Sequence, residues 1–412
     1  MFSQLSSLVP SLKSYTRQSK EHTVNIAPAE IYDVETAREK SARALKHLLK
    51  LNHANFSLLY NGLMLYNHIP HLLSTAYLFG ADHEHLNRLY ESESAELEPW
   101  ADSPGEIGDD DWRDFLGKRD YQRAFLDFFE DEVVRCGYDW KGVLEKYLFS
   151  RKTPLINCAV SGFGHPLLHL GYAYEMNSRE VAMEALSMIA ACYSNTHEYL
   201  DDPTYLQSAS MYKTNSLIEI IGQLRSDRSL NGAFEEASAS NFGKLLETHE
   251  SLLLQHWAAW DITDATEQFE DIQRLATALL VNSGGKSHDF FFVQLLTTTH
   301  AIRVILPVIP AQYHISLLRQ WWLLALGVYI AELRPEVSAS SVDEIENYDL
   351  GGRDWSWVTQ HALRDTAPIS MHYTKSLRTL TEAGKTWKYH DGYYLRAAVK
   401  FIDEFKGWSG LD

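Results

Sequence analysis

Histidines recur at helical spacing inside the most apolar stretches of this 412-residue chain. His165 and His169 lie four residues apart in GFGHPLLHLGYAYE, a spacing that puts two imidazoles on one helix face, where both can bind one metal ion. His68 and His71 lie three residues apart in NHIPHLL, and Pro70 between them is expected to kink the helix. These spacings indicate a metal site, although the same spacings also occur in helices that bind nothing.

Two further apolar segments carry histidines of the same kind. His300 lies in FFFVQLLTTTHAIRVILP, and His372 lies in ISMHYTKSL, one turn before Lys375. A nitrogen-rich set suits iron, zinc, copper or nickel better than magnesium or calcium. The HExxH motif of zinc proteases is absent because two leucines fill the middle of the HPLLH pair, and no HxD or HxE supplies the carboxylate of the common iron motif.

Lys375 offers a source for the missing oxygen ligand. A lysine one turn from a histidine is ordinarily a surface residue whose stem lies on the protein while its ammonium reaches water. If it is buried instead, its pKa falls, and a neutral amine can add carbon dioxide to become a carbamate that binds metal as a carboxylate does. Both interpretations stay open at the level of the sequence.

Each of these histidines, taken alone, could also have a purely structural role in the core. A single histidine on an apolar face is more often a hydrogen-bonded core residue than a metal ligand. Several helices that each direct an imidazole inward change this balance, because the neutral rings then need partners and one shared cation supplies them all.

The segments around these residues have the sequence pattern of helices. Apolar residues recur mostly at three- and four-residue spacing, and few segments alternate as a half-buried strand does. The pattern predicts an all-α protein, a single large multi-helix domain over residues 1–412 with a histidine-lined interior site. Expected helices include 34–56, an almost wholly apolar one over 57–80 that ends at a glycine, and 242–260. The acidic segment 91–112 is expected to be a loop, either a lid or an insertion.

Composition excludes several classes of function. The formal net charge of -18, without a Lys and Arg cluster, argues against nucleic-acid binding. The run WWLLALGVYIA is about half of the roughly 20 residues that cross a membrane, so no membrane partner is expected. Cys136, Cys158 and Cys192 form no CxxC motif, and the first residues lack the pattern of a secretory signal. We therefore expect a cytoplasmic protein.

Four blocks of sequence together resemble the questin oxidase-like proteins of fungal aromatic polyketide pathways: NHIPHLLSTAYLFGA, GFGHPLLHLGYAYE, DFFFVQLLTTTHAIRVILP and HYTKSLRTL. The resemblance implies oxygen-dependent opening of an anthraquinone ring by non-haem iron(II), with dioxygen as co-substrate. Carried over position by position, it implies these ligands: His68, His165, His169, His300, His372 and Lys375. His71 is then expected to be a catalytic residue that lies beside the metal ligands without binding the metal.

The resemblance leaves specific points open. Gln294 departs from the pattern, since a histidine is expected there in some relatives. The histidines outnumber the positions to fill, so either His165 or His169 lies outside the ligand set. Some relatives are described as using a nicotinamide cofactor, yet no GxGxxG follows a strand here.

Several functions therefore compete. The first is an iron oxygenase that cleaves a carbon–carbon bond of an anthraquinone or related polyketide. Alternatives are an NADPH-dependent Baeyer–Villiger-type oxidase of the same substrates, a zinc-dependent hydrolase or lyase that uses the same histidines, and a helical scaffold in which the histidines are structural. The expected partner is a small aromatic molecule, and the oligomeric state is not predicted.

Overall fold

The computed structural model describes residues 20–149, 153–207, 210, 212–282, 287–337, 339–363 and 371–410. Helices dominate these residues, as the apolar spacing predicted. Those of eight residues or more are α2 Lys40–Asn55, α3 Ile69–Leu78, α4 His83–Ser94, α5 Gln122–Arg135, α6 Trp140–Leu148, α7 His165–Met176, α8 Arg179–Ala191, α11 Leu217–Ser226, α12 Ser240–Thr248, α13 Glu250–Ala258, α14 Ala265–Asn282, α15 Phe290–Ile305, α16 His314–Ala331, α17 Ala339–Glu346, α18 Trp355–Ala362, α19 Met371–Thr386 and α20 Asp391–Glu404. The short elements are α9 Glu198–Asp201, α10 Thr204–Gln207 and the strands β1 Leu59–Tyr60, β2 Leu65–Tyr66, β3 His288–Asp289 and β4 Trp408–Ser409.

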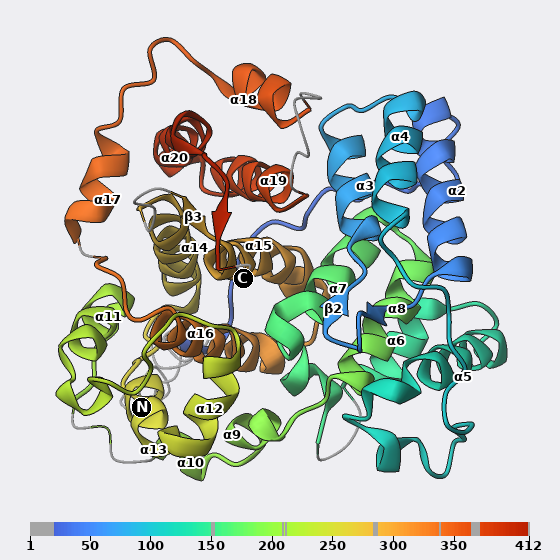
Figure 1. Cartoon of the computed structure of the whole chain (residues 1–412), viewed down its shortest axis with the longest axis horizontal. Helices are drawn as coiled ribbons and strands as arrows, with labels where there is room; N and C mark the ends of the chain where they lie inside the picture. Colours follow the sequence, from blue (N-terminus) through green and yellow to red (C-terminus); the bar gives the residue numbers. More distant parts are fainter. Residues whose placement is uncertain are drawn as a thin grey trace, which may run out of the picture.

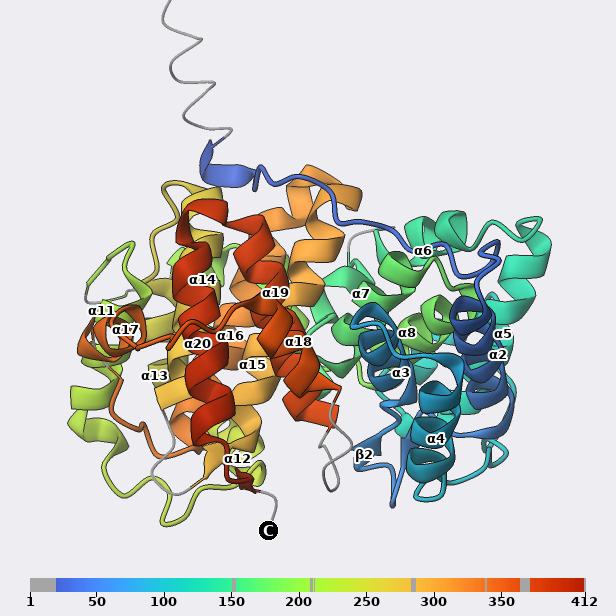
Figure 2. The ribbon, with the colours of Figure 1, turned by 90° about the horizontal axis from the view of Figure 1, so that it is seen from above.

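The two halves of the chain form two sides of one helical body. Figure 1 shows α2 to α8 on one side and α11 to α20 on the other, and Figure 2 shows the same division from above. The middle helices join the sides: α7 packs against α8 and α15, and α15 packs against α16 and α19. Because α3 contacts both α7 and α19, these three helices meet at the junction.

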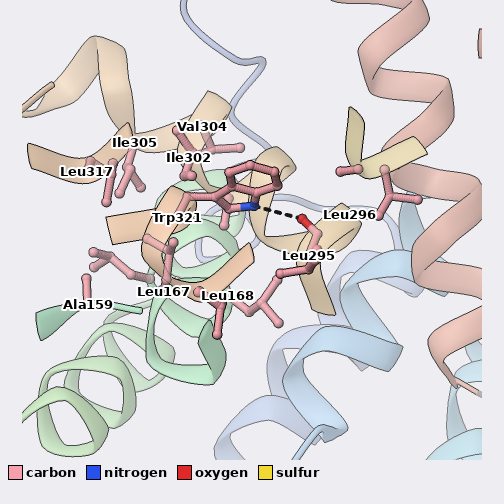
Figure 3. Packing of buried hydrophobic residues seen from close by; sticks show 14 of the residues in the cluster. Ala159, Leu167, Leu168, Leu295, Leu296, Ile302, Val304, Ile305, Leu317 and Trp321 are labelled. Atoms are coloured by element: carbon pink, nitrogen blue, oxygen red, sulfur yellow. Dashed lines mark hydrogen bonds between the residues drawn. The ribbon is translucent and has the colours of Figure 1, made fainter. Parts of the chain in front are cut away.

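An apolar core fixes the central helices relative to one another. Figure 3 shows Trp321 of α16 among leucines of α7 and aliphatic side chains of α15, and its indole Nε1 donates a hydrogen bond to the carbonyl of Leu295 at 3.0 Å. Trp321, Leu167 and Leu295 are wholly buried. Burial of such side chains stabilises each by roughly 1.5–3 kcal/mol, and the indole hydrogen bond sets the register of α16 on α15.

The predicted helix over 57–80 is wrong in its first half. β1 and β2 pair antiparallel there, with Leu59 opposite Tyr66, and the turn between them includes Asn61 and Gly62 at positive φ. Asn-Gly is a strong hairpin signal, because both residues tolerate the left-handed backbone that a tight turn needs. Some apolar residues of the segment are buried, such as Leu58 and Leu59, while Met64 and Leu65 are exposed, and the helix begins only at Ile69.

The predicted kink at Pro70 is also wrong. His68 is the residue before α3, so Pro70 falls in the first helical turn, where a missing N–H removes no helix hydrogen bond. Pro166 occupies the same position in α7. The expected helix over 242–260 is divided at His249 into α12 and α13.

The segment 91–112 is partly helical. Its first residues continue α4 to Ser94, and an irregular stretch then leads to a short turn of helix at Trp112–Phe115. With α5 this stretch lines a cavity of about 770 Å³, to which none of the candidate site residues contributes. Its role as a lid stays a prediction.

Gly171 permits the close packing of α7 on α15. A Cβ atom at this position would lie 2.9 Å from both Cα and Cβ of Ala301. We expect Gly171→Ala to lower the free energy of unfolding by about 1–3 kcal/mol, because the two helices must move apart. Thermal denaturation measures this, with Gly243→Ala, where a Cβ meets nothing within 4 Å, as the control. Equal melting temperatures for the two variants would contradict the expectation.

A pair of carboxyl groups, one buried and one partly buried, makes stability depend on pH. Asp289 caps α15 by accepting from the backbone N–H groups of Phe291 (2.8 Å) and Phe292 (3.2 Å), and it hydrogen-bonds to Glu332. Burial, with the charge of Asp289, raises the pKa of Glu332 to about 8. Since the folded protein binds a proton that the unfolded chain releases above about pH 4.5, this stabilisation is complete below that pH and is lost as the pH rises through about 8.

Glu332→Gln keeps a hydrogen-bond donor but removes the titration. We expect this variant to melt roughly 2 °C or more above the wild type at pH 8.5, whereas the difference narrows below pH 6. Differential scanning calorimetry across this range is the measurement, and Glu336→Gln, at an exposed carboxylate that pairs with Arg225, is the control. If the melting temperatures of wild type and Glu332→Gln changed in parallel with pH over this range, Glu332 would be ionised throughout it, and the prediction would be wrong.

Other expectations concern the membrane and the cysteines. Among the described residues, one stretch, Phe290–Val308, is long and apolar enough to cross a membrane, but 83% of its most apolar window is buried inside the protein, which is typical of a core helix. Cys136, Cys158 and Cys192 are all free thiols.

Candidate functional site

Four histidines and a lysine gather from α3, α7 and α19. His71 lies on α3, His165 and His169 lie on α7, and His372 and Lys375 lie on α19. All are buried, and the side chain of Lys375 is among the most deeply buried in the protein. His68 joins them from the position just before α3. The site therefore occupies the junction between the two sides of the body, where α3, α7 and α19 meet near the centre of Figure 1.

A tight turn before α7 orients His165. Gly162, Phe163 and Gly164 all have positive φ, which lets the chain reverse immediately before the helix. The Nδ1 of His165 donates to the carbonyl oxygen of Gly162 at 2.6 Å. This hydrogen bond leaves the lone pair on Nε2, which is the arrangement by which proteins usually present a metal-binding histidine.

The aromatic rings stack in a column. The rings of Tyr66 and His165 are parallel with centroids 4.0 Å apart, and the rings of His165 and His68 are parallel at 4.7 Å. His372 meets His68 edge-on at 5.1 Å. Beside the column, Nε2 of His71 and Nδ1 of His169 lie 2.7 Å apart, so a proton is shared between them.

Five polar atoms of this cluster are buried without a hydrogen-bond partner among the described residues. They are Nε2 of His68, Nδ1 of His71, Nε2 of His169, Nδ1 of His372 and Nζ of Lys375. A buried polar group that lacks a partner costs about 1–3 kcal/mol, and proteins rarely carry several together without a functional reason. The concentration of such atoms in one place indicates a ligand site.

Burial keeps the imidazoles neutral. It lowers the pKa of His165 and of His169 to about 3, with the nearby charge of Lys375 acting in the same direction. Burial and Lys375 together also hold the pKa of His68 and of His372 far below the usual value. Neutral imidazole is the form that binds metal.

Lys375 is poised between its two protonation states. Burial lowers its pKa to about 7, so a substantial fraction of the amine is uncharged near neutral pH. Of the two interpretations that the sequence left open for Lys375, the structure shows the buried one. An uncharged buried amine is nucleophilic, which is the condition that carbamate formation requires.

His300 does not join the cluster. Its Nε2 lies 3.4 Å from Oε2 of Glu175, whose other oxygen accepts a hydrogen bond from Arg378 at 2.7 Å. Although burial opposes the ionisation of Glu175, the charge of Arg378 and the proximity of His300 bring its pKa down to about 2. His300 therefore belongs to a buried ion-pair network, and its predicted role as a ligand gains no support from this position.

A chain of polar contacts runs from the cluster to the surface, and sequence reasoning missed it. Nε2 of His169 faces Oε2 of Glu184 at 3.7 Å, and Glu184 contacts Nδ1 of His53 at 3.0 Å. Nε2 of His53 contacts Glu130, which is half exposed, at 2.7 Å. Burial alone lowers the pKa of His53, but its two carboxylate partners raise it to about 10. The only sequence signal was an acidic residue on the buried face of α8.

Gln294 occupies the position where the family pattern suggested a histidine. It is buried on α15, and neither of its amide atoms has a partner among the described residues. It lies one helical turn after Phe290, whose ring packs against His372 at 4.5 Å. Gln294 therefore places a hydrogen-bond donor and an acceptor on the same face of α15 as Phe290, which contacts the cluster.

The donor atoms fit a metal ion in kind. Neutral imidazoles without partners, beside an amine, match the ligands of first-row transition metals, and the hydrogen bond from His165 to Gly162 matches the usual support of such a ligand. Within the described ranges, no three His, Cys, Asp or Glu side chains stand in a ready-made ligating arrangement. His71 and His169 instead contact each other. Ligation thus requires some side chains to turn toward a common point.

Fold and site together define an all-helical protein with a buried cluster of nitrogen donors. Comparison with protein families makes the assignment specific: the family described as Questin oxidase-like matches residues 65–380. The chain belongs to this family. The match contains every candidate residue of the site.

Characterised relatives are fungal enzymes. A Baeyer–Villiger oxidase of Pestalotiopsis microspora is 28% identical over 178 residues, which cover 41% of this chain and 38% of the relative. The questin oxidase of Aspergillus terreus is 25% identical over 201 residues, 47% of this chain and 45% of the relative. A Baeyer–Villiger oxidase of Emericella nidulans is 24% identical over 291 residues, 64% of each. The chain matches less than half the length of the first two.

Proposed function

We propose that this protein is an oxygen-dependent oxidoreductase that cleaves a ring of an anthraquinone or a related aromatic polyketide, with non-haem iron(II) in the histidine cluster. The observation that carries the proposal is the group of buried, neutral imidazoles around Lys375, whose polar atoms have no partner among the described residues. The names of the fungal relatives support the substrate class.

Within this proposal, the residues that hold iron are His68, His165, His169, His372 and Lys375. Iron(II) would supply the activation of dioxygen, which reacts slowly with closed-shell organic molecules. His71 positions His169 through its contact with Nδ1, which leaves Nε2 of His169 for the metal. Oε2 of Glu184 lies 3.7 Å from that Nε2 atom. His300 is left to the network with Glu175.

Lys375 contributes an oxygen ligand as a carbamate. Its uncharged amine attacks the carbon of carbon dioxide, a nitrogen–carbon bond forms, and one proton leaves, so that the side chain ends in a carboxylate. The deep burial of Nζ protects the product from water, and its negative charge offsets part of the charge of a divalent cation. The cluster then presents imidazoles with one anionic oxygen, a ligand combination typical of non-haem iron.

The rest of the chain excludes water and holds the substrate still. The tyrosine and phenylalanine rings that touch the histidines, Tyr66, Tyr172 and Phe290, close the site against solvent. A closed apolar environment protects reactive intermediates from hydrolysis and strengthens each electrostatic contact inside.

A Baeyer–Villiger-type oxidation that consumes NADPH is the second candidate, because several relatives are named Baeyer–Villiger oxidases. Both reactions insert oxygen beside a carbonyl group, and they differ in whether a reductant is consumed. Oxygen uptake measured with an anthraquinone substrate, with and without NADPH, separates them. We also propose a reducing cytoplasmic location, consistent with three free cysteines.

The experiment that tests the proposal is metal analysis by plasma mass spectrometry on protein purified without chelator, followed by oxygen-uptake assays with hydroxyanthraquinones. About one iron per chain with oxygen uptake supports the iron oxygenase. Stoichiometric zinc without oxygen uptake would instead favour a hydrolase or lyase. A well-folded protein without transition metal and without iron-dependent activity would overturn the proposal.

A further inference from the structure

A second cavity lies directly beside the histidine cluster. It has a volume of about 220 Å³ and is lined mainly by apolar side chains from the turn before α7, from α12 and from α16. The lining residues used below are Arg119, Gly162, Phe163, Phe242, Leu246 and Leu324. We call this space the side cavity. Its volume lies below the 300–1,000 Å³ of typical drug-sized sites, which suits a compact ligand of a few fused rings.

The side cavity shares a wall with the cluster. Gly162, which lines the cavity, accepts the hydrogen bond from Nδ1 of His165. The ring of Tyr66 stacks on His165, and its hydroxyl accepts a hydrogen bond from Nη2 of Arg119 at 3.3 Å. One aromatic ring and one turn of backbone therefore separate the two spaces, and a Cβ atom at Gly162 would lie 2.3 Å from the hydroxyl oxygen of Tyr66.

Arg119 brings an uncompensated positive charge to this wall. Its Nη1 donates to the carbonyl oxygen of Leu63 at 2.9 Å, and its Nη2 donates to Tyr66. Both acceptors are neutral, and no carboxylate of the described residues forms an ion pair with Arg119. A guanidinium has five N–H donors, so several remain for a ligand, and its charge favours an anionic oxygen.

Phe163 gives the side cavity an aromatic wall at the cost of backbone strain. It adopts φ 55° and ψ 32°, a left-handed conformation that is rare for a bulky residue. Its ring contacts Phe242 at a centroid distance of 5.8 Å and Phe291 at 5.7 Å. Strained residues concentrate at ligand clamps, where the surrounding structure holds them. This observation is independent of the charge of Arg119.

We propose that the side cavity binds the flat ring system of a hydroxylated polycyclic aromatic substrate, with its faces against Phe163, Phe242 and Leu324, and that Arg119 binds the ionised phenolic oxygen. The edge of the substrate then lies toward Tyr66 and His165. The inference rests on the proposed function for the identity of the substrate class, and it adds where the substrate binds and which residue selects its phenolate.

The probes are 2-hydroxyanthraquinone and unsubstituted anthraquinone, titrated into the full-length protein as purified. Tryptophan fluorescence quenching gives the affinity, and the long-wavelength absorption band of the phenolate reports ionisation. For Arg119→Gln we expect about tenfold weaker binding of the hydroxylated probe, loss of its phenolate band at neutral pH, and less than about a twofold change for anthraquinone. Arg119→Lys keeps the charge and should retain most of the band.

Two further variants locate the binding. Arg123→Gln is the matched control, because Arg123 lies nearby in the first turn of α5 but pairs with Asp127 and lines the other cavity. Leu246 lines the side cavity and is partly exposed, so a tryptophan at this position can fill the cavity. Leu246→Trp should therefore abolish binding of both probes. Thermal melting confirms that each variant folds.

The outcomes keep this inference separate from the proposed function. An unchanged affinity in Leu246→Trp, or equal losses for both probes in Arg119→Gln, would overturn the inference even where iron and oxygen uptake are present. Binding that is lost in His68→Ala but kept in Leu246→Trp would place the probe on the metal and would also overturn it. Specific loss in Arg119→Gln and Leu246→Trp supports the cavity, even if oxygen uptake is absent and the proposed function fails.

Discussion

His68→Ala is expected to leave the protein folded but without bound iron and with at least about a 100-fold loss of oxygen uptake. His68 lies between the rings of His165 and His372, and its Nε2 has no partner among the described residues. Residues that merely support a ligand change metal affinity by about 10–100-fold, so a residue that binds the ion directly should exceed this range.

The thermal stability of wild type and His68→Ala, with and without iron, distinguishes a metal ligand from a structural residue. Removing an unpaired buried polar group relieves a desolvation cost, so metal-free His68→Ala should be about as stable as the metal-free wild type. Added iron should raise the melting temperature of the wild type and leave that of the variant unchanged, because only a native state that binds metal gains from it. Calorimetry with and without iron, beside plasma mass spectrometry, measures both effects.

Two control variants replace histidines outside the proposed ligand set. His47→Ala removes an exposed histidine of α2 and should retain full iron. His300→Ala removes a histidine that contacts Glu175 in place of the cluster, so it should keep most iron while it loses stability. Retention of stoichiometric iron in His68→Ala would refute the proposed ligand set, and loss of iron in His300→Ala would restore His300 to it.

Sequence spacing identified the cluster because helical periodicity is a local property. The interval between His165 and His169 places that pair on one side of α7. His68 and His71 also come together, although His68 lies just before α3 and not within it. The same reasoning could not show what each face meets. His300 looks equivalent in sequence, yet α15 directs it to Glu175, which is 125 residues away in the chain.

The residues that sequence reasoning missed are those whose roles depend on long-range contacts. Glu184 became relevant only because α8 packs against α7, and Arg119 only because it reaches Tyr66. The hairpin at β1 and β2 was missed for a different reason, since each strand has only two residues, too few to show the alternation that marks a strand. Its Asn61–Gly62 turn was the local signal that would have found it.

Lys375→Ala is expected to remove most of the iron and to reduce oxygen uptake by about 100-fold or more, because the carbamate is the only anionic ligand in the proposed set. The wild type should bind iron poorly when it is refilled in buffer freed of carbon dioxide, and bicarbonate should restore the binding. The variant should not respond to bicarbonate, whereas a short carboxylic acid that enters the space left by the side chain should partly restore its activity.

Lys385→Ala is the matched control, because Lys385 lies on the same helix, is exposed and pairs with Glu382. Intact-mass analysis should find the added mass of one carbon dioxide in the wild type and none in Lys375→Ala. If Lys375→Ala keeps its iron in buffer with or without bicarbonate, the lysine is not a ligand. Its deep burial beside His68 and His372 would then act only by keeping their imidazoles neutral, since its charge opposes their protonation.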